Sequence, residues 1–242
     1  NFIFIRSGET SWKRVIALVN ITLSILIILM TGSRGGFLAL GIVALLLFFT
    51  RADVVKSSYK IIVGVMTVIA LIYGGSTIDF SRLETMTQIG GDYNVWDETG
   101  RIEVWKKGLL FMLGDPLTGV GISCFGEAIG TDRLNRGLQE FWQSPHNSLI
   151  QIGAETGVLG LFLFILISYR SYQIFGKAKN RSGDQKIGII AELTQIAFIG
   201  HLTASMFLSQ AYSGIWVLFV ALSAMLLEQI KTVSVQLHGQ LE

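Results

Sequence analysis

The chain has 242 residues, of which 51% are apolar and only 15% are charged, and its mean hydropathy is +0.56. Soluble domains usually carry about 25% charged residues, so this balance excludes a disordered chain, a nucleic-acid-binding domain with a basic face and a disulfide-stapled secreted module. The net charge of +2 is too small to indicate an acidic partner, and the single cysteine, Cys124, cannot form an internal disulfide. Charged residues are absent from several long stretches, which predicts an all-α, polytopic membrane protein.

Six apolar stretches are candidates for membrane-spanning helices. In chain order they cover Val15–Thr31, Gly36–Thr50, Ile61–Tyr73, Asn147–Tyr169, Ile187–Phe207 and Tyr212–Leu227. A helix that crosses the bilayer core needs about 20 residues, so the second and third stretches are short. The chain begins at Asn1 and not at Met, and Phe2–Ile5 are apolar, so we expect further helices upstream.

These stretches predict four successive regions, which are three spanning helices in residues 1–73, an extracytoplasmic loop at 74–146, three spanning helices in 147–230 and a cytoplasmic tail at 231–242. Lysine and arginine cluster before the first span and between spans two and three and spans four and five, which places these segments in the cytoplasm. From Asp79 to Glu140 the opposite loop holds ten acidic and six basic residues, which leaves a net charge of −4.

The middle of the long loop has the pattern of an amphipathic helix. It runs from Gly100, with Thr99 as a possible cap, to Gly114, and Pro116 follows as a stop signal. Arg101 precedes Trp105 by four residues, so the two side chains share one face of this helix. One interpretation is a helix on the membrane surface with Arg101 at its edge. Beyond it, Gly119 and Gly121 predict a tight turn and not a dinucleotide-binding loop.

A second arginine lies in a minimal turn, Gly32-Ser33-Arg34-Gly35-Gly36, between the first two spans. On the outer face, Arg34 would run against the positive-inside rule. It would either anchor the turn by reaching the interface, or leave its guanidinium open for bidentate binding of an anion such as phosphate.

The fourth span begins with a polar cluster. Ser144 suits an N-cap and Pro145 the first helical position, which would place His146 in the first turn beside free backbone N–H groups. Asn147, Gln151 and Glu155 then follow at a spacing of four residues and form a polar stripe on one helix face. A carboxylate inside a membrane helix is a functional candidate, most simply as the partner of an arginine.

Small residues near the same place suggest close packing. Gly153 and Gly157 form a small-xxx-small pair, which predicts a second helix packed against the fourth span. The sequence contains none of the common metal-binding motifs, and its three histidines are far apart.

Three pieces of the sequence together resemble the O-antigen ligase and O-antigen polymerase family of bacterial membrane glycosyltransferases. They are Ser33-Arg34-Gly35-Gly36, the stretch from Gly100-Arg101-Ile102-Glu103-Val104-Trp105 to Asp115-Pro116-Leu117-Thr118-Gly119-Val120-Gly121, and Pro145-His146-Asn147-Ser148 followed by Glu155-Thr156-Gly157. Their order and the long loop between them also match. Members of the family have about twice as many helices, so the chain resembles their carboxy-terminal half.

The resemblance implies transfer of a glycan from an undecaprenyl-pyrophosphate carrier to a hydroxyl of a glycan, lipid or protein acceptor, at the outer face of the bacterial cytoplasmic membrane. It implies no cofactor, no metal and no nucleic-acid partner. The family's functional arginines correspond to Arg34 and Arg101, and its loop-end histidine to His146. The resemblance covers both ligases and polymerases.

Elementary chemistry agrees with these roles. A pyrophosphate leaving group gains negative charge as the glycosidic bond breaks, and Arg34 and Arg101 are the cations facing outward that can stabilise it. His146 can accept the proton of the acceptor hydroxyl. Asn147 and Glu155 are further candidates for binding the pyrophosphate or glycan on position alone. A lipid-linked glycan transporter or flippase and a non-enzymatic membrane scaffold remain alternative interpretations.

Overall fold

The computed structural model describes residues 11–31, 33–50, 64, 68, 100–181 and 184–238. Within these ranges the chain forms seven helices and no strand, which agrees with the predicted all-α class. The helices are α2 (Ser11–Met30), α3 (Arg34–Phe49), α7 (Arg101–Gly114), α8 (Phe125–Asn135), α9 (Ser148–Arg181), α10 (Gln185–Ser205) and α11 (Gly214–His238). The third predicted span, Ile61–Tyr73, and loop residues 74–99 lie outside the described residues, apart from Gly64 and Val68.

Three helices are long and apolar enough to cross a membrane, namely Ser148–Arg181, Gln185–Ser205 and Gly214–Thr232. They correspond to the fourth, fifth and sixth predicted spans. The first two predicted spans form shorter apolar helices, Val15–Ile28 and Gly35–Phe49. Of the six predicted spans, the described residues thus contain three of full length and two short ones.

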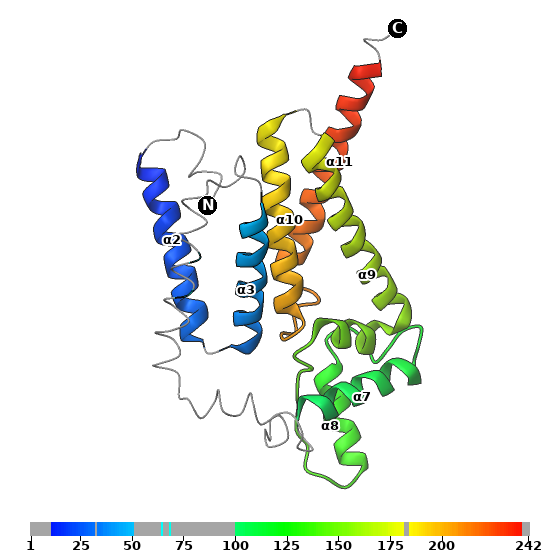
Figure 1. The fold of residues 1–242 in the computed structure, drawn as a ribbon. Helices are drawn as coiled ribbons and strands as arrows, with labels where there is room; N and C mark the ends of the chain where they lie inside the picture. The colour runs from blue at the N-terminus through cyan, green and yellow to red at the C-terminus, as the bar shows by residue number, and fades with distance from the viewer. Residues whose placement is uncertain are drawn as a thin grey trace. The chain divides into compact units, whose positions relative to one another are not determined.

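The helices divide into two compact units. The first unit contains α2, α3, α10, the part of α9 from Ser171 onward and the part of α11 from Leu218 onward. In this unit α2 packs on α3 through Ile25 and Phe37, and α3 packs on α10 through Leu47 and Ile196; the three helices run side by side in Figure 1.

Local sequence explains where α3 begins and ends. Its N-cap is Ser33, whose Oγ accepts a hydrogen bond from the backbone N–H of Gly36 at 3.2 Å. At the other end the Thr50 hydroxyl donates to the Leu47 carbonyl at 2.6 Å. Arg34 is therefore the first helical residue, directly after the cap.

The second unit contains residues 81–170 and 205–217, within which the described helices are α7, α8, the first part of α9 and the first residues of α11. The predicted helix that ends at Gly114 is confirmed, since α7 covers Arg101–Gly114 and is capped by Asp115. Val104, Phe125, Ile129 and Ala154 form the buried core between α7, α8 and α9. At Gly108 the chain has no room for a side chain, because Ile150 and the Phe125 ring occupy that space.

The fourth predicted span is broken at Gly157. Gly157 has φ 72° and ψ −173°, a conformation that is essentially restricted to glycine, and the helix resumes after it. The backbone N–H of the next residue, Val158, donates a hydrogen bond to the carbonyl of Pro116 at 2.8 Å. The loop after α7 thus approaches Gly157. At Gly153 a Cβ would lie 2.8 Å from the sulfur of Met112 in α7, so the close helix packing that the small-xxx-small pair predicted is present at Gly153.

The same loop satisfies the carbonyl groups that the break leaves free. The N–H groups of Val120 and Gly121 donate to the carbonyls of Ala154 and Glu155, at 2.9 and 3.1 Å. Gly119 has φ +61°, and a Cβ there would collide with the backbone of residues 154–156. The predicted tight turn is present, and its glycines allow two backbone segments to touch.

Candidate functional site

Arg101 is the first residue of α7 and is exposed to solvent. The N-cap of α7 is Gly100, which offers no side chain to the helix end. Within the described part of the chain, the Arg101 guanidinium forms no ion pair or hydrogen bond, whereas Lys106 is paired with Glu103 and Lys107 with Asp132. Arg101 therefore differs from the other cations of α7 in that its charge is available to a ligand.

The next turn of α7 is anchored to the start of α9. The indole Nε1–H of Trp105 donates to the carbonyl of Pro145 at 2.7 Å. Arg101 shares the helix face of Trp105, and His146 directly follows Pro145, so this bond holds the first turn of α7 near His146. The positive charge of Arg101 lowers the pKa of His146, second to the effect of partial burial, as expected for close neighbours.

The helix cap differs from the prediction. Asn147, and not Ser144, caps α9, because the Asn147 Oδ1 accepts from the N–H groups of Leu149 and Ile150 at 2.9 and 3.2 Å. His146 thus precedes the cap and does not lie in the first turn. It has φ +46°, an uncommon conformation for a residue with a side chain. Asparagine is as good an N-cap as serine, and the tertiary contacts decided between the two.

Two hydroxyls contact His146. Its backbone N–H donates to the Ser209 Oγ at 3.1 Å, and its ring Nε2 lies 3.3 Å from the Ser144 Oγ. Because partial burial and then Arg101 lower the pKa of His146 below its ordinary value of 6.5, the imidazole is neutral at pH 7. An exposed neutral imidazole beside an available guanidinium can accept a proton next to a bound anion.

The segment between α10 and α11 also belongs to the site. The Ser148 hydroxyl donates to the Leu208 carbonyl and accepts from the Gln210 N–H, both at 2.9 Å. The Gln151 Oε1 accepts from the N–H of Ala211 at 3.3 Å. These bonds hold the segment, and with it Ser209, against the first turns of α9. No motif marks Ser209, and its sequence signal is a spacing of four residues from Ser205 and eight from His201, which gives a polar stripe at helical spacing.

Glu155 is 2% exposed and its carboxylate is bound by the backbone. Its Oε2 accepts from the N–H of Ser123 at 3.0 Å and its Oε1 from the N–H of Phe125 at 3.4 Å. Burial, and then the hydrogen bond and charge of Glu155, raise the pKa of Tyr212 well above its ordinary value. Among the described residues, the partners of Glu155 are thus the start of α8 and Tyr212. We had expected an arginine as its partner.

The predicted site residues are divided between the two units. Arg34 belongs to the first unit, where it begins α3, and its side chain lies outside the described part of the structure. Arg101, His146, Asn147 and Glu155 all belong to the second unit. Of these four, the structure brings Arg101 and His146 together at an exposed position, while the oxygens of Asn147 and Glu155 accept hydrogen bonds from backbone N–H groups.

A comparison with protein-family models gives a match to the family described as O-antigen ligase, over residues 19–165. A comparison with curated proteins gave no match. The family match covers more than half of the chain and includes all three motifs, and the apolar helices agree with the membrane location of such proteins. The chain is therefore a membrane protein that belongs to the O-antigen ligase family of glycosyltransferases.

Proposed function

We propose that the protein transfers a glycan from an undecaprenyl-pyrophosphate carrier to an acceptor hydroxyl, at the outer face of the bacterial cytoplasmic membrane. The observation that carries the proposal is the exposed pair formed by Arg101 and His146, which combines an available cation with a neutral imidazole. The acidic loop and the basic segments between the other spans support the outward orientation of this pair.

Arg101 and Arg34 bind the pyrophosphate in this proposal. As the bond between the anomeric carbon and the pyrophosphate oxygen breaks, its electron pair passes to that oxygen, and the charge of the leaving group increases. A guanidinium donates two parallel hydrogen bonds to a phosphate and stays charged throughout the reaction. Two such groups supply the charge stabilisation that a divalent metal provides in other transferases.

His146 accepts the proton of the acceptor hydroxyl as the acceptor oxygen bonds to the anomeric carbon. Because its pKa is lowered, the His146 ring is neutral at pH 7 and can accept this proton. One displacement at the anomeric carbon inverts its configuration. The Asn147 amide nitrogen is proposed to donate to a substrate oxygen beside His146, and Glu155 to support the glycan site from beneath the turn that it holds.

The test measures glycan transfer by the full-length protein in membranes, with a purified lipid-linked donor. We expect Arg101→Ala, His146→Ala and Arg34→Ala each to reduce turnover by about 100-fold or more, as for the loss of a catalytic acid, base or anion-stabilising group. Lys106→Ala removes a neighbouring exposed cation of α7 and is the matched control, with turnover near wild type.

Product formation at the wild-type rate by the Arg101 and His146 variants, at equal expression, would overturn the site assignment. The anomeric configuration of the product, measured by NMR, tests the single displacement, and retention would refute it. Movement of intact donor across the membrane without any product would instead favour the transporter.

A further inference from the structure

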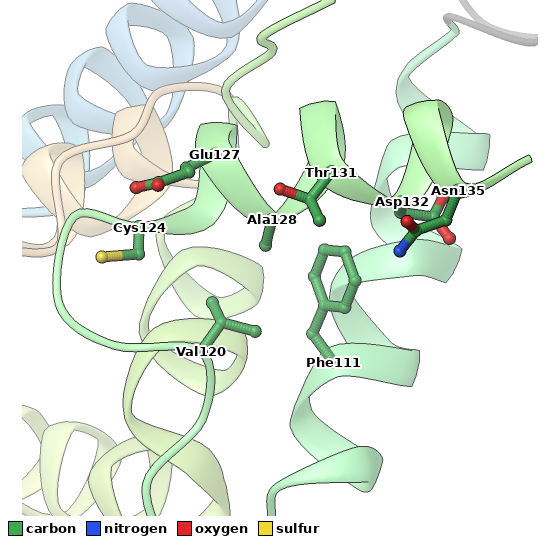
Figure 2. Close-up of a pocket in the computed structure, with 8 residues that line it drawn as sticks. All are labelled: Phe111, Val120, Cys124, Glu127, Ala128, Thr131, Asp132 and Asn135. Atoms are coloured by element: carbon green, nitrogen blue, oxygen red, sulfur yellow. The ribbon is translucent and has the colours of Figure 1, made fainter. Parts of the chain in front are cut away.

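A pocket of about 570 Å³ lies between α7, α8 and the loop that precedes α8. Figure 2 shows the Phe111 ring in its middle, with Ala128 and Thr131 of α8 facing the ring and Val120 on the loop side. The buried Phe125 ring packs edge to face against Phe111, with their ring centroids 6.0 Å apart. The middle of the pocket is thus apolar, and its size suits a small organic ligand.

Three polar side chains of the pocket lie on one face of α8. Glu127, Thr131 and Asn135 follow one another at a spacing of four residues, and all three side chains are exposed. Within the described residues, none of the three forms a side-chain hydrogen bond or an ion pair. A row of exposed acceptors and donors about 6 Å apart, set by the helical rise of 1.5 Å per residue, therefore borders the apolar middle.

The charge of the pocket restricts the ligand. Its second carboxylate, Asp132, is paired with Lys107 at 3.1 Å and also with Arg136, so these cations are not available to an anion. Burial acts to raise the pKa of Asp132, but the bonds and charges of Lys107 and Arg136 outweigh it and lower the pKa. With Glu127 negative, the pocket repels phosphates. One available carboxylate, one amide and one hydroxyl are also too few hard ligands for a calcium or magnesium site.

We propose that this pocket is a saccharide-binding subsite. The C–H face of an uncharged pyranose ring packs on Phe111, Val120 and Ala128, and its hydroxyls bond to the row formed by Glu127, Thr131 and Asn135. Burial of an apolar face, with a few polar groups that fix orientation, is the usual design of a small-ligand site. A polyhydroxylated ring offers both in one molecule.

The subsite is separate from the reacting groups. Phe111 follows Arg101 by ten residues, which is about 15 Å along α7, and the two side chains lie about 80° apart around the helix axis. The pocket would therefore bind a sugar unit of an extended glycan away from the anomeric carbon that reacts. This role in transfer rests on the proposed function, whereas saccharide binding itself does not.

The test is saturation-transfer NMR on the full-length protein, in a detergent that has no sugar headgroup. The probes are maltotriose and N,N′-diacetylchitobiose, two uncharged saccharides. We expect at least one probe to receive saturation from the protein, and Thr131→Ala and Asn135→Ala each to raise its Kd by about three- to ten-fold, the effect of one lost neutral hydrogen bond. Leu134→Ala changes an exposed residue of α8 that does not line the pocket, and should leave the Kd unchanged.

Because Thr131 and Asn135 are exposed and bond to no described side chain, their substitution should leave the fold intact, which circular dichroism can verify. No saturation of either probe, or equal Kd values for wild type and both pocket variants, would overturn the proposal. In the transfer assay these variants should raise KM without lowering kcat, unlike Arg101→Ala. Saccharide binding by a protein that transfers no glycan would refute the proposed function and leave the subsite standing.

Discussion

Replacing Glu155 by alanine removes the carboxylate that holds the start of α8. In the native protein this side chain, 2% exposed, accepts hydrogen bonds from the N–H groups of Ser123 and Phe125. Alanine leaves both N–H groups without this acceptor, and that of Phe125 is buried. Ser123, which has φ +63°, would then lose a contact that stabilises its uncommon conformation.

The magnitude follows from the two bonds. A hydrogen bond to a charged acceptor contributes about 1.5–3 kcal/mol, and the bond to Phe125, at 3.4 Å, is long and belongs at or below the lower limit. We therefore expect Glu155→Ala to lower the free energy of local opening by about 2–4 kcal/mol, or about 30- to 1,000-fold in the opening equilibrium. Glu155→Gln keeps one acceptor oxygen and should lose about half of that free energy.

The assay is amide hydrogen exchange of the peptide that covers residues 116–130, measured by mass spectrometry on the full-length protein. Exchange of this peptide should accelerate in both Glu155 variants, in the stated order. Glu103→Ala, which breaks an exposed ion pair with Lys106, is the control and should leave the peptide unchanged. Wild-type protection of residues 116–130 in Glu155→Ala would refute the view that this carboxylate organises the turn.

Three further predictions concern the site. Because Arg101 lowers the pKa of His146, Arg101→Ala should move the midpoint of the His146 NMR titration to higher pH. Turnover by the wild-type protein should rise with pH through a midpoint below 6.5. An unchanged titration in Arg101→Ala would contradict the proximity of Arg101 and His146. Ser209→Ala removes the hydroxyl that accepts a hydrogen bond from the His146 backbone N–H. It should lower kcat by about two- to ten-fold with little change in KM, the effect of one hydrogen bond. An effect on KM alone would argue against a role of Ser209 in positioning His146. Lys107→Met removes the cation that pairs with the half-buried Asp132 of α8. It should lower the melting temperature measurably more than Lys106→Met, since the exposed pair of Lys106 contributes about 1 kcal/mol or less. Equal melting temperatures of the two variants would refute this difference.

Apolar helices were predictable because their signal is local. The stretches Val15–Thr31 and Gly36–Thr50 each contain enough apolar residues in sequence to form α2 and α3, with ends close to the predicted ones. The helix over Arg101–Gly114 was predictable for the same reason, since its periodicity and its stop signal lie within one segment. By contrast, α8 has two glycines and little periodicity, and its helical structure depends on packing with α7 and α9.

The sequence by itself determined the membrane class, the family motifs and the pairing of Arg101 with Trp105 on one helix face. Only the tertiary structure decided what the other motif residues do. The break at Gly157 leaves carbonyl groups free, and the loop around Gly119, more than thirty residues earlier, binds them. The choice of Asn147 as the helix cap and the contact of Ser209 with His146 likewise depend on partners far along the chain. Hydrogen-bond partners distant in sequence are selected by packing, and local patterns contain no record of that choice.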